Sequence, residues 1–136
     1  MNRPILLSYQ LLTGFSDTST GALLMVAPVF TIRLMHLHTP ADALPFLSFI
    51  GAFVLSVGLS CLYGAFLIAR GACTPRLEIV WLLTAFTRSG VAIFVVTQIL
   101  TCTLEVGWLT VAISDGACVV IQGIGLRRGW LANVAR

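Results

Sequence analysis

The chain has 136 residues, of which 58 % are hydrophobic and only 10 % are charged, and its mean hydropathy is +1.00. A soluble domain carries about 25 % charged residues, so this composition excludes an ordinary soluble globular fold. The net charge is +3, and every basic residue is an arginine. These arginines interrupt long apolar runs instead of gathering on one face, which argues against nucleic acid as a partner. The composition therefore indicates an integral membrane protein that has the lipid bilayer as its main partner.

Four apolar stretches are long enough to cross a bilayer, which requires about 20 residues. They cover about residues 11–35, 44–69, 77–100 and 106–126, and the residues before the first are expected to form an amphipathic lead-in. Pro28 predicts a bend in the first stretch, because its ring removes a backbone hydrogen bond. The connections are short, so consecutive helices are expected to be antiparallel neighbours. The sequence thus predicts an all-α fold in which residues 1–136 form one transmembrane domain, an up-down-up-down four-helix bundle.

The arginines also predict an orientation, because basic residues in short loops accumulate on the cytoplasmic side. One side of the predicted bundle carries six of them, Arg3, Arg70, Arg76, Arg127, Arg128 and Arg136, and the other side carries Arg33. We therefore expect both termini to be cytoplasmic, in the inner (plasma) membrane of a bacterium. Trp81 and Trp108 lie near the starts of two spans and are expected at opposite membrane interfaces.

Small residues recur at every fourth position of the second predicted span, at Ser48, Ala52, Ser56, Ser60 and Gly64. Such a ridge lets a neighbouring helix approach closely, which favours association in lipid. The ridge has two interpretations. It packs against the first or third span, or it forms a contact with a second copy of the chain or with another membrane subunit.

Three charged residues, Asp17, Arg88 and Asp115, lie inside the predicted spans. At a rise of 1.5 Å per residue, Arg88 and Asp115 are both roughly 15 Å from the cytoplasmic ends of their helices. One unpaired charge at the centre of a membrane helix costs about 2.5 to 3.5 kcal/mol. The sequence therefore predicts that Arg88 pairs with Asp115, with Asp17 as a second candidate partner.

Other polar residues share the helix faces of these charges. Gln10 and Thr13 precede Asp17 at spacings of three and four, Thr84 lies one turn from Arg88, and Gln122 follows Asp115 on the same stripe. Two interpretations remain open for this intramembrane polar site. It is a structural ion pair that fixes helix register, or it is a site for a solute, a proton or a lipid headgroup.

No residue pattern points to a metal, a cofactor or catalysis. The histidines, His36 and His38, lie in a predicted loop, and the cysteines, Cys61, Cys73, Cys102 and Cys118, lack the spacing of metal ligands. The cysteines are expected to be buried, except for Cys73 in a loop. Nucleophile elbows, phosphate loops and catalytic triads have no counterpart in the sequence. We expect a protein that is not an enzyme and that has no metal or cofactor.

The four-span plan, with an aspartate in the last span followed by arginines in SDGACVVIQGIGLRRG, resembles the DoxX-like group of small bacterial four-helix membrane proteins. This resemblance covers the topology and implies the fold; it transfers no catalytic residue. The leading hypothesis is a non-enzymatic accessory or scaffold subunit. The alternative is a small transporter or channel with a proton- or solute-coupled Asp/Arg site. The resemblance alone implies a third role, a quinone- or lipid-binding subunit of a redox complex.

Overall fold

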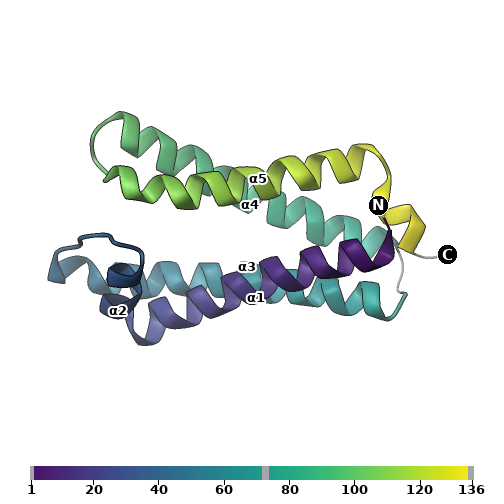
Figure 1. Cartoon of the computed structure of the whole chain (residues 1–136), viewed down its shortest axis with the longest axis horizontal. Coiled ribbons are helices and arrows are strands. Elements are labelled where there is room, and N and C mark those ends of the chain that lie inside the picture. Colours follow the sequence, from purple (N-terminus) through teal and green to yellow (C-terminus); the bar gives the residue numbers. More distant parts are fainter. Residues whose placement is uncertain (1, 72–73, 135–136) are drawn as a thin grey trace.

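A computed structural model describes residues 2–71 and 74–134, and all of its regular elements within these ranges are helices (Figure 1). Four long helices run side by side in alternating directions: α1 (Arg3–Val26), α3 (Leu44–Ala69), α4 (Thr74–Leu100) and α5 (Leu109–Arg127). A short helix, α2 (Pro28–Leu34), follows α1, and single 3-10 turns cover Ala41–Ala43, Val106–Trp108 and Trp130–Val134. The predicted all-α class is confirmed.

Within the described ranges, three segments are long and apolar enough to cross a membrane: Ala41–Ala69, Pro75–Leu100 and Val106–Arg127. They coincide with the second, third and fourth predicted spans. Helix α1 is not among them, because residues 16–20 form an unbroken polar run. The region of the first predicted span, 11–35, differs in its helix bounds: the helix already begins at Arg3 in the expected lead-in, and it is interrupted at Ala27.

The interruption at Ala27 has a direct chemical cause. Pro28 has no N–H, so it cannot donate the helical hydrogen bond to the carbonyl of Leu24. The hydroxyl of Ser48 in α3 donates to this carbonyl instead, at 3.3 Å. The predicted bend at Pro28 is thus a full break between α1 and α2, with Ala27 at φ −139° and ψ 61°.

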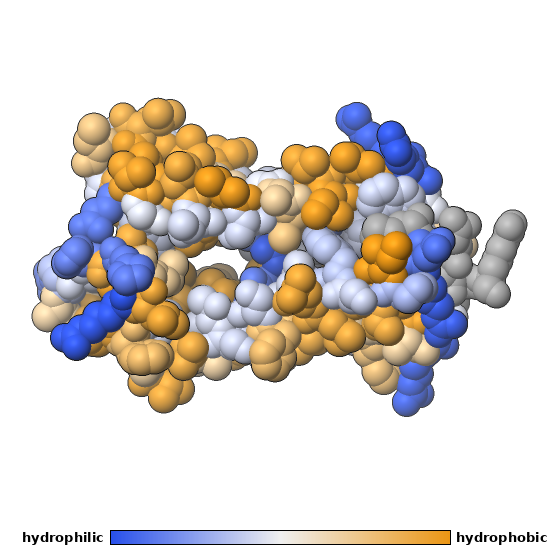
Figure 2. All heavy atoms as spheres, viewed as in Figure 1, coloured by the Kyte–Doolittle hydropathy of each residue, from blue (hydrophilic) through white to orange (hydrophobic). Residues whose placement is uncertain are grey.

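The bundle has two chemically different ends (Figure 1). We call the end at which α1 and α4 begin and α3 and α5 end the terminal end, and the opposite end the loop end. Five arginines lie at the terminal end, Arg3, Arg70, Arg76, Arg127 and Arg128, whereas Arg33 lies at the loop end. Arg136 and Cys73 are outside the described residues. Hydrophilic atoms gather at both ends, and hydrophobic side chains cover much of the surface between them (Figure 2).

The long helices form two pairs, α1 with α3 and α4 with α5. The α1–α3 pair approaches at glycines spaced seven residues apart, Gly14 and Gly21 on α1 and Gly51 and Gly58 on α3. A methyl group at Gly21 would meet the backbone of Leu55, and one at Gly58 would meet the backbone of Thr18. Small residues permit this close approach, so the two backbones lie almost in contact.

The two pairs contact each other near both ends of the bundle. At the terminal end, an apolar cluster joins residues of three long helices and the last 3-10 turn: Leu6, Ile68, Leu77, Trp81 and Leu131. At the loop end, Ile32, Leu37 and Leu47 pack with Trp108. Trp81 is 0 % exposed, so its ring packs inside the bundle and does not lie on the outer surface. Between the middle and the loop end, the surface is hollowed between the pairs (Figure 2).

Candidate functional site

Arg88 is the centre of the polar site and joins the two helix pairs. Its side chain is buried, and its two terminal nitrogens donate to different carboxylates. Nη2 donates to Oδ2 of Asp17 in α1, and Nη1 donates to Oδ1 of Asp115 in α5 at 2.5 Å. The predicted pair with Asp115 is confirmed, and Asp17 is a second partner. One guanidinium thus connects α4 to a helix of the same pair and to a helix of the other pair.

The two carboxylates keep more accessible surface than the arginine. The side chains of Asp17 and Asp115 are 21 % and 14 % exposed, compared with 6 % for Arg88. Hydrophilic atoms are visible at the edge of the hollow between the helix pairs, about halfway along the molecule (Figure 2). When both carboxylates are ionised, the cluster carries one negative charge more than positive charge. The site is therefore held together by Arg88 without being electrically balanced by it.

The polar residues of three helices follow one another at spacings of three or four, so each set lies on one helix face. Residues at the same level on α1, α4 and α5 form three layers. From the middle of the bundle toward the terminal end, we call these the charged layer, the middle layer and the inner layer. The charged layer is Asp17, Arg88 and Asp115; the middle layer is Thr13, Thr84 and Cys118; the inner layer is Gln10, Trp81 and Gln122. Seven residues separate the first layer from the third on each helix, which corresponds to roughly 10 Å.

The middle layer is linked to the inner layer by a hydrogen bond between α5 and α4. Nε2 of Gln122 donates to Oγ1 of Thr84 at 2.9 Å, and Thr84 donates in turn to the Val80 carbonyl at 2.8 Å. Thr13 donates to the carbonyl of Tyr9 within its own helix at 2.8 Å, so it makes no comparable link.

The fourth long helix of the site is α3, which contributes Cys61 beside Arg88 and Thr13. Cys61 is buried, as expected, and Cys118 is only half-buried, but the prediction is wrong for Cys102. Cys102 is exposed in the turn after α4, where it has a φ of 57°. Sequence reasoning did not assign Cys61 to the site, because the sequence alone gives no register between α3 and α4.

The inner layer is fully enclosed. Gln10, Trp81 and Gln122 are each 0 % exposed. Within the described part of the chain, both amide atoms of Gln10, Nε1 of Trp81 and Oε1 of Gln122 have no hydrogen-bond partner. Trp81 was not predicted to belong to the site, although it lies seven residues before Arg88 on the same helix face.

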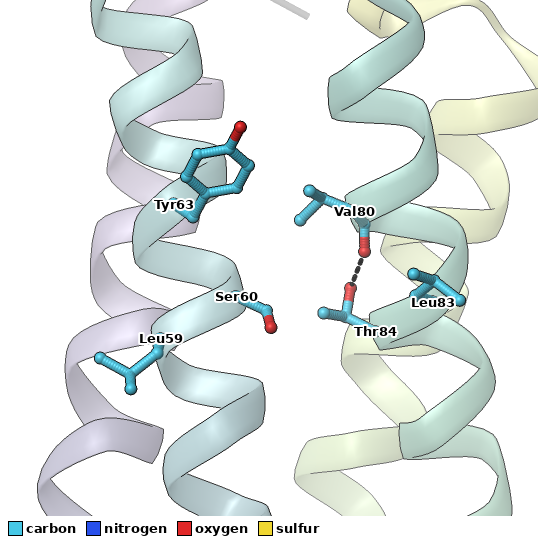
Figure 3. Close-up of a pocket in the computed structure, with 6 residues that line it drawn as sticks. All are labelled: Leu59, Ser60, Tyr63, Val80, Leu83 and Thr84. Atoms are coloured by element: carbon cyan, nitrogen blue, oxygen red, sulfur yellow. Dashed lines mark hydrogen bonds between the residues drawn. The ribbon is translucent and has the colours of Figure 1, made fainter.

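The predicted small-residue ridge does not act as one packing face. Ser48 contacts α1 through the Leu24 carbonyl, and Gly64 lies against the amide of Gln10. Ser56 and Ser60 are exposed and donate to carbonyls of their own helix, at 2.8 Å each, while Ala52 is half-buried. Ser60 faces Thr84 across an open groove between α3 and α4 (Figure 3). The groove contains cavities of about 300 and 190 Å³.

The histidines lie at the loop end, away from the polar site. His38 faces Glu105, with 3.8 Å between Nδ1 and Oε1, and the backbone N–H of His38 donates to Oε2 of Glu105 at 3.4 Å. Among the described residues, no three His, Cys, Asp or Glu side chains come together as metal ligands would. This exposed pair connects the two loops of the loop end.

Comparison with family models, with curated proteins and with solved structures finds no match to the chain. The resemblance to DoxX-like proteins therefore stays a prediction, and so does the quinone- or lipid-binding role that it implies.

Proposed function

We propose that the protein is a non-enzymatic accessory or scaffold subunit in a bacterial inner membrane, a four-helix bundle that Arg88 holds in register. The observation that carries this proposal is the buried guanidinium bonded to carboxylates on α1 and α5. Charges within a membrane are costly unless they are paired, so only one register of the helices satisfies all three residues. The cluster therefore specifies one arrangement of the two helix pairs.

The environment of α1 supports its crossing the membrane together with the other three long helices. Its glycine face packs along α3, and Asp17 points to Arg88 instead of the surface. Its outward positions carry large apolar side chains, including Leu12, Phe15 and Val26. Such a helix buries its polar stretch inside the bundle and offers apolar side chains to lipid or to a neighbouring subunit.

A second candidate function, a small transporter with a proton- or solute-coupled site, is favoured by the two carboxylates. They outnumber the guanidinium and keep accessible surface in the middle of the bundle. Intramembrane carboxylates with these properties are typical of ion and proton pathways. This candidate requires flux, whereas the scaffold does not.

Flux measurements in reconstituted vesicles separate the two candidates. Under a pH gradient, we expect wild-type vesicles and Asp115→Asn vesicles to show the same flux as protein-free vesicles. Asp42→Asn, which removes an exposed carboxylate in the connection before α3, is the matched control. A saturable flux that is present in the wild type and in Asp42→Asn, and absent in folded Asp115→Asn, would replace the scaffold proposal with transport.

The proposed orientation places the terminal end in the cytoplasm. It is supported by the five arginines of that end against Arg33 at the loop end. We expect a phosphatase that is active only outside the cytoplasm to be inactive when fused to the C-terminus and active when inserted in the turn after α4. The reverse pattern of activities would show that the arginines do not set the topology.

A further inference from the structure

The inner layer gathers buried polar atoms whose hydrogen bonds are not made by the protein. Gln10 offers an amide donor and an acceptor, Trp81 offers an indole N–H, and Gln122 offers a carbonyl oxygen. The Tyr9 hydroxyl and Nε of Arg88 are also unpartnered among the described residues. Leaving such a group unpaired in a protein interior costs about 1 to 3 kcal/mol. The four atoms of the inner layer and these two further atoms all lack partners within the described part of the protein.

These side chains line one region between the helix pairs. The ring of Tyr9 lies 5.7 Å from the ring of Trp81, and the Trp81 ring also lies against Gly125 of α5. The amide of Gln10 lies against Gly64, where a methyl group would collide with it. Glycine on α3 thus lets the amide of Gln10 lie directly against the backbone, and glycine on α5 does the same for the indole of Trp81.

We propose that ordered water binds in the inner layer and bridges Gln10, Trp81 and Gln122. The set contains both donors and acceptors and no charge, which suits a neutral molecule that does both. A buried water typically makes about three hydrogen bonds to polar groups of this kind. This proposal does not depend on whether the protein is a scaffold or a transporter.

In one direction, the bound water extends from the inner layer toward the charged layer. In the other direction, it is closed off at the terminal end. Nε of Arg88 and the Tyr9 hydroxyl continue the series of unpartnered atoms toward the two carboxylates. At the terminal end, the bundle is closed by apolar residues: Leu6, Ile68, Leu77 and Leu131. The result is a hydrated column with one closed end, which solvates the excess charge of the cluster from the terminal side.

The fluorescence of Trp81 reports directly on this water. In a Trp108→Phe, Trp130→Phe background, Trp81 is the single tryptophan that remains. We expect its buried indole N–H to exchange with deuterium while the protein stays folded, because bound water supplies the exchange partner. This measurement needs no change within the column. An indole that stays protonated until the protein unfolds would overturn the proposal.

Substituting the amides gives a second, independent result. In the same background, Gln10→Met and Gln122→Met are expected to shift the Trp81 emission to shorter wavelength and not to raise the unfolding midpoint, because each removes a water ligand. Gln98→Met, on α4 and outside the column, should leave the emission unchanged. Higher stability of both inner-layer variants with unchanged emission would show that the amides are dry, and would also overturn the proposal.

Discussion

Replacing Arg88 with methionine is expected to destabilise the protein by about 3 to 5 kcal/mol, because breaking a buried ion pair leaves uncompensated charge in the interior. Here the loss exposes two carboxylates to each other in the middle of the bundle. Unfolding followed by circular dichroism during titration of a mild detergent with a denaturing one measures the change. Arg76→Met, which removes an exposed arginine at the terminal end, is the control and should change stability by less than about 0.5 kcal/mol.

Removing the carboxylates together with the arginine should restore most of this stability. The variant Arg88→Met, Asp17→Asn, Asp115→Asn contains no orphan charge, and neutral replacements of buried ion pairs are often tolerated. The double variant Arg88→Met, Asp115→Asn, which keeps Asp17, should recover only part of the lost stability, because this carboxylate loses its partner. If Arg88→Met is as stable as the wild type, the guanidinium does not hold the helices.

Gly58→Ala is expected to destabilise the protein by about 1 to 3 kcal/mol, because the added methyl group would overlap the backbone of Thr18 and force α1 away from α3. The sign is informative, since alanine in place of glycine normally stabilises a helix by about 0.5 to 1 kcal/mol. Gly90→Ala provides the matched control in α4, where the new methyl group meets open space.

The same detergent titration compares the two glycine variants. We expect Gly58→Ala to unfold at a lower denaturant fraction than the wild type, and Gly90→Ala to unfold at an equal or higher one. Equal stabilisation of both variants would mean that α1 and α3 do not approach as closely as the glycine contacts require.

The charged layer could be predicted from the sequence because charge is so rare in this chain. Arg88 and Asp115 lie at matching depth in antiparallel spans, and pairing is the least costly arrangement for both. Asp17 was the second candidate partner, and the long arginine side chain reaches it as well. The later three spans could also be predicted, because their apolar runs end at glycine, proline or charged residues.

The boundaries of α1 and the packing of the helices could not be predicted from the sequence in the same way. Polar residues before and within α1 suggested a lead-in and a later start, whereas tertiary contacts bury Gln10 and pair Asp17. The ridge of small residues spaced four apart in α3 drew attention to Ser56 and Ser60, which line an open groove between α3 and α4 and make no close helix contact. The glycines at seven-residue spacing carry the contact with α1, and only the observed register distinguishes the two patterns.

The burial of Trp81 illustrates a limit of positional rules. A tryptophan near the start of a membrane span is typical of the interface, but Trp81 shares a helix face with Thr84 and Arg88 and is enclosed by the other helices. Its spacing of seven residues from Arg88 was the available signal. Polar and aromatic residues on one face of a charged membrane helix are therefore candidates for the interior.

The most direct test of the central claim, that Arg88 holds the two helix pairs together, is a distance between them. Spin labels at Phe15 in α1 and Ile113 in α5, both exposed and each two residues from a carboxylate of the cluster, report this distance by pulsed electron paramagnetic resonance. In a background with the native cysteines replaced by alanine, we expect one narrow distribution with Arg88 present and a longer, broader one in Arg88→Met. An unchanged narrow distribution in Arg88→Met would contradict the claim.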